Sequence, residues 1–373
     1  MSLRRAAGAC GLAALVACGH SEPLQPERHA PDTPRFPGLP RRLTLNRGDD
    51  GSPAWLADAG AILYTADWGD HPDRDRCLVE LPPDGGAARR TICHRAPGGD
   101  DSTDVYASAA ASPDGRLAFL HVTSRPTDRA PVGASLRLAT VADPAASTEL
   151  LGLPRILPSG RPHSHLSQLQ WLGTDALVYL AERFVYLGPP AGPDTLLLGI
   201  EVAHLSLGGG SPVLASVPGT TSATSVGAGE TPGVIYYTLM GDSRIYRRVL
   251  SSGEVTVAHD FGGRIARDVR RVGSRLLAVV GGKVAVVADP ALGAYQRDEG
   301  GGLVLVDPAT GHETPLSAGQ ILFRRPAPAP AGARLVVEGF PYTLLEIRDG
   351  NGQVIGLDTL VATRGDLWLY EAQ

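Results

Sequence analysis

The sequence repeats one short pattern, a tight turn followed by a short apolar strand, along most of its length. In the copy that shows the pattern best, Ser112-Pro113-Asp114-Gly115 precedes Arg116-Leu117-Ala118-Phe119. Proline presets φ, aspartate bonds to nearby backbone and glycine accepts the left-handed conformation, so these residues favour a turn. The apolar strands of the six copies begin at Ile62, Leu117, Leu177, Ile235, Leu276 and Leu335, which are 55, 60, 58, 41 and 59 residues apart.

A repeat of this length predicts a β-propeller. The shortest spacing, 41 residues, is about the length of a bare four-stranded blade, and the other units look like the same blade with an insertion of about 15 residues. Many short strands separated by turns, with no convincing amphipathic helix, favour a propeller over a sandwich. We therefore expect an all-β propeller with six blades, and seven blades is the main alternative. An extra apolar segment in the fifth unit, Lys283 to Ala288, does not fit the four-strand pattern.

The two ends of the repeat region predict how the ring closes. The last unit stops after its third strand, Leu367 to Tyr370, a few residues before the sequence ends. Arg41 to Asn46 lies just upstream of the first unit, looks like an outer strand and has no unit of its own. Pairing this segment with the last unit would remove two exposed strand edges. We therefore expect residues 41–373 to form one propeller domain, closed by an N-terminal strand.

The N-terminal segment predicts export. Arg4 and Arg5 precede an apolar run from Ala6 to Ala17, whose 12 residues are too few for a membrane-spanning helix and are typical of a signal peptide. Leu15-Val16-Ala17-Cys18 resembles the lipobox of bacterial lipoproteins, in which the cysteine is acylated and becomes the mature N-terminus. The alternative is an ordinary secretory signal in which Cys18 has no role.

The lipoprotein interpretation predicts where the protein resides. Residues 1–17 would be the signal peptide, and residues 18–40, which contain six prolines, would be an extended tether. Gly19 follows the cysteine, where an aspartate would disfavour transfer to the outer membrane in enteric lipoproteins. We expect the N-terminal lipid to be the only membrane attachment, and the protein to lie in the cell envelope at the outer membrane, facing the periplasm.

Two cysteines remain for the mature domain. Cys77 to Leu81 and Arg89 to Cys93 look like two strands of a hairpin whose turn contains Gly85, and the two cysteines are equidistant from that glycine. In a symmetric register they would face each other, at a separation that a disulfide can span. We expect a disulfide between Cys77 and Cys93, as an exported protein allows. The alternative is two separate buried thiols.

The repeat also resembles a known family. Leu43-Thr44, then Gly48-Asp49-Asp50-Gly51-Ser52-Pro53-Ala54-Trp55, and later Ala111 to Phe119, are similar to the repeat of TolB-type, WD-repeat-like propellers. In that family an outer strand ending in Leu-Thr runs into a Pro-Ala-Trp-Ser-Pro-Asp-Gly pattern. The resemblance spans about Arg41 to Gln373 and is good in the first two units. It implies a six-bladed exported scaffold whose relatives bind other envelope proteins.

Composition and motifs narrow the function. The formal charge is −5 and the basic residues are almost all arginine, which argues against a nucleic-acid-binding surface. The sequence has no Gly-x-Ser-x-Gly elbow, no His-Glu-x-x-His helix and no P-loop. Two groups could bind a metal but look like loop residues: His163 with His165, and the acidic stretch from Asp67 to Asp75. We therefore expect neither a metal nor a cofactor. We name no catalytic residue.

The insertions predict a binding face. In five units they fall between the second and third strands, and such connections all emerge on one face of a propeller. Aromatic and arginine side chains on loops that a rigid frame holds are typical of a binding surface. The alternative is that they cover blade edges. The candidate residues are Trp68, His71, Arg125, Phe184, Tyr186, Tyr295, Arg297, Phe340 and Tyr342.

Two hypotheses of function follow. The first is a monomeric, lipid-anchored, non-catalytic scaffold that binds an envelope protein or peptide on the insertion face. The second is a propeller enzyme, a lyase or hydrolase, that acts on a saccharide or peptide in the central funnel. Propeller enzymes need acids, histidines or metal ligands from several blades, and the sequence shows no obvious set. A metal with three or more side-chain ligands at the channel mouth would reverse this preference.

Overall fold

The regular secondary structure of the described chain consists of β-strands, as the repeat predicts. The computed structural model describes residues 38–45, 48–67, 76–92, 103–124, 131–153, 162–186, 195–208, 211–282, 284–289, 293–298, 300–316, 319–362 and 364–371. Across these ranges no helix has the length and apolar character needed to cross a membrane.

Within the described residues, all strands except β20, β21 and β26 fall into six antiparallel groups of four, which we call blades 1 to 6 and give from the inner to the outer strand. A parallel pair of residues, Arg76 and Val105, joins the first two groups into one sheet. Blade 1 is β2 (Asp50–Trp55), β3 (Ile62–Asp67), β4 (Arg76–Leu81) and β5 (Arg90–Ile92), and blade 2 is β6 (Thr103–Ala111), β7 (Arg116–Ser124), β8 (Pro131–Thr140) and β9 (Thr148–Leu153). Blade 3 is β10 (Pro162–Leu172), β11 (Ala176–Tyr186), β12 (Thr195–Ser206) and β13 (Val213–Ser216), and blade 4 is β14 (Ala223–Ala228), β15 (Val234–Leu239), β16 (Arg244–Val249) and β17 (Val255–Asp260). Blade 5 is β18 (Ala266–Val272), β19 (Arg275–Val280), β22 (Gly302–Val306) and β23 (Glu313–Pro315), and blade 6 is β24 (Ile321–Pro328), β25 (Arg334–Arg348), β27 (Asp366–Glu371) and β1 (Arg41–Arg42).

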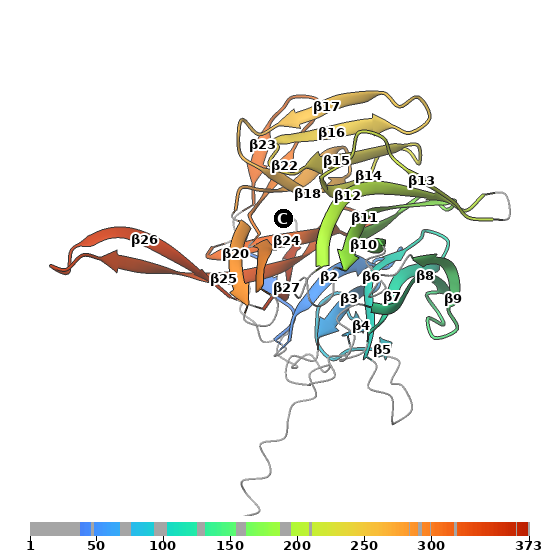
Figure 1. Ribbon diagram of the computed structural model, residues 1–373, viewed down its shortest axis with the longest axis horizontal. Coiled ribbons are helices and arrows are strands. Elements are labelled where there is room, and N and C mark those ends of the chain that lie inside the picture. Colours follow the sequence, from blue (N-terminus) through green and yellow to red (C-terminus); the bar gives the residue numbers. More distant parts are fainter. Residues whose placement is uncertain are drawn as a thin grey trace, which may run out of the picture.

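The blades follow one another around a ring (Figure 1). Each inner strand contacts the inner strand of the next blade, and β24 of blade 6 contacts β2 of blade 1. The core has the same arrangement, because one cluster of buried apolar side chains lies between each pair of consecutive blades. Side chains alternate between the two faces of a strand, so each blade packs against both neighbours. The fold is a β-propeller.

The N-terminal strand closes this ring, as the sequence predicts. Arg41 and Arg42 pair with Leu369 and Trp368 of β27. The pairing continues past the regular strand, because the N–H of Leu43 donates to the carbonyl oxygen of Leu367 at 2.7 Å. Among residues 41–45, only Arg41 and Arg42 form ladder pairs, and Asn46, the end of the expected strand, lies outside the described residues.

One carboxylate at this closure has an unusual environment. Asp366, the first residue of β27, lies 2.5 Å from a guanidinium nitrogen of Arg42 through its Oδ2 atom. Its Oδ1 atom is buried and has no hydrogen-bond partner among the described residues. Burial raises the pKa of Asp366 to about 6, because it outweighs the opposing effect of Arg42, and the nearby Asp49 carboxylate raises it further. The ionised form of Asp366 therefore destabilises the folded protein.

We expect mild acidification to stabilise the protein through Asp366. The folded pKa of about 6 lies above the usual aspartate value of 3.8, so between these two pH values the folded state holds a proton that the unfolded state has released. Lowering the pH from 7 to 5 should add about 1 kcal/mol to the free energy of unfolding. Asp366→Asn should abolish that gain, as measured by urea unfolding at both pH values. A variant that keeps the same pH dependence as wild type would contradict this assignment.

Two inserted hairpins account for the strands that lie outside the four-stranded blades. The extra segment of the fifth unit forms β20 (Val284–Asp289), which pairs with β21 (Gly293–Asp298) as a separate two-stranded hairpin between β19 and β22. In blade 6, β25 runs beyond the blade and its far half pairs with β26 (Val354–Val361). Both are hairpins inserted after a second strand, where the sequence places the insertions.

The structure describes one of the two cysteines that are predicted to form a disulfide. Cys77 lies on β4 and is disulfide-bonded. The β4–β5 ladder pairs Leu78 with Ile92 and Val79 with Thr91, which is the symmetric register that the prediction requires. Cys93 lies outside the described residues, so its pairing with Cys77 stays a prediction.

Tryptophans at the ends of inner strands join neighbouring blades. Trp171 of blade 3 donates its Nε1–H to the carbonyl oxygen of Ala110 in blade 2 at 2.9 Å. The guanidinium carbon of Arg116, the residue that follows the blade 2 turn, lies 4.8 Å from the centre of that indole ring. The repeated turn therefore also supplies a cation to the next blade. The same arrangement joins blades 1 and 6 through Trp55, Ala327 and Arg334.

We expect Trp171→Phe to lower the free energy of unfolding by about 1–2 kcal/mol, because it removes the indole N–H donor to the carbonyl oxygen of Ala110 and weakens the contact with Arg116. Urea unfolding, followed by circular dichroism, measures this difference. A change within about 0.5 kcal/mol, which is usual for surface substitutions, would show that the indole N–H does not join the blades.

Candidate functional site

Every inner strand is irregular at the same level of the channel that these strands enclose. The antiparallel register shifts by one residue in all six described blades. Such shifts are β-bulges, which re-aim side chains. In five of these strands a non-glycine residue has a positive φ, a conformation that costs about 1 kcal/mol or more. These residues are Ser52 (50°), Ser108 (51°), Gln168 (54°), Asp268 (52°) and Arg325 (49°), and all are polar.

Hydrogen bonds across blades 3 to 6 fix this level of the channel. Gln168 donates from Nε2 to Oδ1 of Asp268 at 2.7 Å, and Oδ2 of Asp268 accepts the backbone N–H of Arg325 at 2.9 Å. Arg270 donates to the carbonyl oxygen of Val226 at 2.9 Å and to Oε1 of Gln168 at 3.3 Å. Burial lowers the pKa of Arg270 to about 10, so Arg270 stays protonated at neutral pH. We call Gln168, Asp268, Arg270 and Arg325 the belt. The cavity at the level of the belt has a volume of only about 40 Å³.

A buried ion triad lies beside the belt in blade 6. Glu338 is 2% exposed, and its two oxygens accept from Arg324 at 2.7 Å and from Arg325 at 3.0 Å. Burial opposes ionisation of Glu338, but the two guanidinium groups hold its pKa below the usual value. Gly51 of blade 1 allows the close approach, since a Cβ atom there would lie 3.1 Å from this carboxyl group. The triad therefore positions two arginines at the channel.

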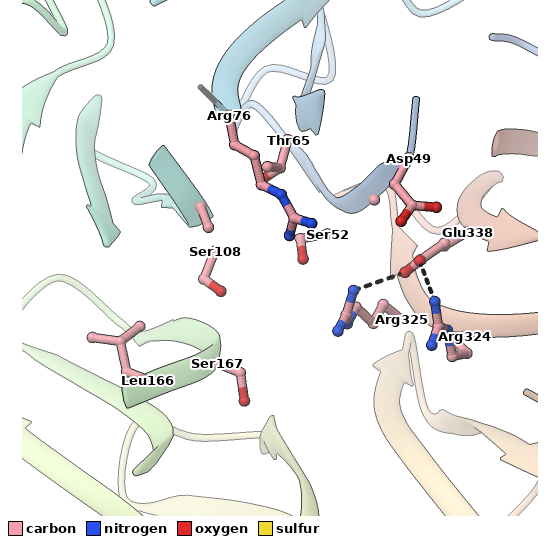
Figure 2. A pocket seen from close by; sticks show the side chains of 12 residues that line it. Asp49, Ser52, Thr65, Arg76, Ser108, Leu166, Ser167, Arg324, Arg325 and Glu338 are labelled. Carbon is pink, nitrogen blue, oxygen red and sulfur yellow. Dashed lines mark hydrogen bonds and ion pairs between the residues drawn. The ribbon is translucent and has the colours of Figure 1, made fainter. Parts of the chain in front are cut away.

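A polar pocket opens above the belt, on the face where second strands end and third strands begin. We call this the insertion face. The pocket has a volume of about 480 Å³. Figure 2 shows the guanidinium groups of Arg76 and Arg325 and the hydroxyl groups of Ser52 and Ser108 around the same open space. A second cavity of about 420 Å³ lies on the other side of the belt, at the face of the repeated turns. The lining of the first consists of Asp49, Gly51, Ser52, Thr65, Arg76, Ala107, Ser108, Leu166, Ser167, Arg324, Arg325 and Glu338.

A long hairpin also projects from blade 6 on the insertion side. It consists of residues 342–361, where the far half of β25 pairs with β26, and we call it the arm (Figure 1). Its turn is well formed, because Oδ1 of Asp349 accepts the N–H groups of Asn351 and Gln353, both at 2.9 Å. Within the described structure, β26 pairs only with β25, so the arm has open edges. Seven large aliphatic side chains are exposed on it: Leu344, Leu345, Ile347, Val354, Ile355, Leu357 and Leu360.

The arm presents apolar side chains on both of its faces. Residues paired across an antiparallel ladder share a face, and successive residues alternate. Leu357 pairs with Glu346, so it lies on the face of Leu344, whereas Leu360 pairs with Thr343 and lies on the face of Leu345. Exposed aliphatic clusters of this kind mark interaction sites in soluble proteins.

The structure describes some of the residues predicted for the binding face and not others. Trp68, His71 and Arg125 lie outside the described residues, as does Cys18. Phe184 and Tyr186 lie on β11, and Tyr295 and Arg297 on β21, both within insertion-face hairpins. Phe340 is only 5% exposed, and its ring centre lies 4.1 Å from the guanidinium carbon of Arg324. Phe340 therefore supports a pocket arginine, and Tyr342, which is half-buried, begins the arm.

The pocket and the aliphatic side chains of the arm were not among the predicted sites, although Tyr342, at the start of the arm, was predicted for the binding face. Arg324, Arg325 and Glu338 are charges within otherwise apolar strands, a signal that could have singled them out. The arm has a turn signal, Asp349-Gly350-Asn351-Gly352, between two aliphatic segments. In the part of the chain that the structure describes, no three His, Cys, Asp or Glu side chains lie close enough to hold a metal ion.

Comparison with known proteins finds similar folds and no related sequence. No family profile matches the sequence, and no curated protein is significantly similar to it. A gluconolactonase from Xanthomonas campestris has a TM-score of 0.54 and 11% identity, with 90% of each chain covered. TolB from Acinetobacter baumannii has a TM-score of 0.45 and 14% identity, over 89% of this chain and 68% of TolB. At 11% identity, the likeness to the gluconolactonase concerns the fold alone.

Proposed function

We propose that this β-propeller is a non-catalytic binding protein of the bacterial cell envelope, which holds a protein partner on its insertion face. In this proposal Cys18 is acylated, residues 18–40 tether a monomeric domain to the outer membrane, and the propeller faces the periplasm. The observation that carries the proposal is the arm, which exposes seven aliphatic side chains on a hairpin with open edges.

The chemistry of the arm favours a partner strand over a lipid surface. Open edges present N–H and C=O groups that lipid cannot satisfy, at a cost of several kcal/mol each. Charged Glu346, Arg348 and Asp358 are interleaved with the aliphatic side chains, which also disfavours insertion into a membrane. An extended segment of another protein would pair with the edge and cover the apolar side chains. We therefore assign an extended strand of an envelope protein as the occupant.

Capture from crosslinked membranes tests this proposal with matched variants. Leu357 on the arm and Val213 on the outer strand β13 are aliphatic residues of similar exposure, 62% and 60%. Leu357→Asp is expected to lose the captured envelope protein, and Val213→Asp to keep it. Loss with both variants, or with neither, would refute a partner site on the arm.

Anchoring makes a separate prediction. Cys18→Ser should leave the protein unlipidated, because the lipobox cysteine is the acylated residue. Metabolic labelling with a palmitate precursor measures this, and wild type should incorporate the label. Equal labelling of the two proteins would show that Cys18 is not the site of attachment.

A further inference from the structure

The insertion-face pocket has an excess of positive charge suited to one carboxylate. Arg76, Arg324 and Arg325 line it together with Asp49 and Glu338, so three cations against two anions give a formal charge of +1. A monoanion balances this charge, whereas a dianionic phosphate would exceed it and face two carboxylates. Guanidinium groups bind carboxylates through paired N–H donors. Arg76 of blade 1 and Arg325 of blade 6 reach the same space from different blades (Figure 2).

The rest of the lining is suited to hydroxyl groups. Ser52, Thr65, Ser108 and Ser167 contribute hydroxyl groups, which can both donate and accept hydrogen bonds. Only Ala107 and Leu166 among the lining residues have apolar side chains, so the pocket offers little to an apolar peptide side chain. Ser52 and Ser108 also hold left-handed backbone conformations that place them at the channel. Strain that recurs at one level of a cavity is typical of a functional site.

We propose that this pocket binds a small hydroxylated carboxylate, the chemical class of the sugar acids. Its volume of about 480 Å³ lies within the range of small-molecule sites. Because the belt narrows the channel beneath it, the ligand enters and leaves at the insertion face. The ligand occupies the pocket and leaves the arm open to the protein partner.

Isothermal titration calorimetry with D-glucuronate as the probe tests the proposal on the full-length protein. We expect saturable binding of glucuronate, and no binding of D-glucose, inorganic phosphate or N-acetyl-alanine at the same concentrations. Arg76→Gln should weaken glucuronate binding at least tenfold, because it removes one of the guanidinium groups that line the pocket. The variant should still fold, because Arg76 lies at the exposed start of β4 and outside the Glu338 triad. Ser52→Ala provides a second, smaller change in the same pocket. Arg348→Gln, on the arm, should bind as wild type does.

The outcomes separate this proposal from the protein-binding one. No binding of glucuronate, or binding that Arg76→Gln leaves unchanged, would overturn the pocket proposal. Equal binding of phosphate would overturn the carboxylate assignment, and equal binding of N-acetyl-alanine would overturn the role of the hydroxyl groups. Leu357→Asp should bind glucuronate normally even if it loses the protein partner. The two proposals can therefore fail independently.

Discussion

Deletion of Arg41 to Asn46 is expected to lower the free energy of unfolding by roughly 5 kcal/mol, or the melting temperature by about 10 °C. The deletion removes the two ladder pairs of β1 with β27 and the side chain of Leu43, which is 2% exposed in the core between blades 1 and 6. It also removes Thr44, whose Oγ1 atom accepts the N–H of Leu367 at 2.9 Å. The contact that joins the two ends of the ring is lost with them.

Thermal unfolding of a second deletion provides the control. Removing Glu22 to Arg35 shortens the predicted tether and should change the melting temperature very little, because that segment offers almost no apolar side chains to a core. If the two deletions melt alike, β1 does not close the propeller. Leu43→Ala refines the comparison, with an expected loss of about 2–5 kcal/mol from the cavity alone.

Glu338→Gln is expected to destabilise the protein by about 3–5 kcal/mol, because it leaves Arg324 and Arg325 side by side without the carboxylate that compensates them. Denaturant unfolding at pH 7 measures the loss. The folded pKa of Glu338 lies below the usual glutamate value of 4.5. Its contribution to stability is therefore present at pH 7 and is lost as the pH falls through the folded pKa. The difference between wild type and variant should therefore shrink in acid.

The arm supplies a matched control for this substitution. Glu346 also pairs with an arginine, Arg348, but both side chains are more than half exposed. Glu346→Gln should therefore cost less than about 1 kcal/mol. Similar losses for Glu346→Gln and Glu338→Gln would contradict the role of burial in the triad.

The fold could be predicted from the sequence because its signals are local. The turn at Ser112 to Gly115 forms the expected bonds, with the N–H of Gly115 donating to the carbonyl oxygen of Ser112 at 3.2 Å. Equivalent turns mark the start of each second strand, so strand order and ring closure follow. The insertions after second strands could also be identified. β20 and β21 lie in a unit whose spacing is too long for a bare blade, and the arm lies between the second and third strands expected at Leu335 and Leu367.

The site could not be predicted in the same way because it depends on contacts between blades. Asp268 and Gln168 are 100 residues apart in the sequence, and only the ring brings them to 2.7 Å. The bulges also shift the alternation of inner strands, so period-two reasoning does not assign Arg325 to the channel. From the sequence, the aliphatic residues of the arm would be assigned to the core, and only the structure shows that they are exposed.

The measurement that tests the central proposal most directly is site-specific photo-crosslinking in intact cells. A photoreactive amino acid replaces Leu357 on the arm in one protein and Val213 on β13 in another, two positions of similar exposure. If the arm holds an envelope protein, light should produce a crosslinked product at position 357 that contains that protein, and none at position 213. The proposal would be contradicted by equal products at both positions, or by no product at position 357 in cells that express the lipidated protein.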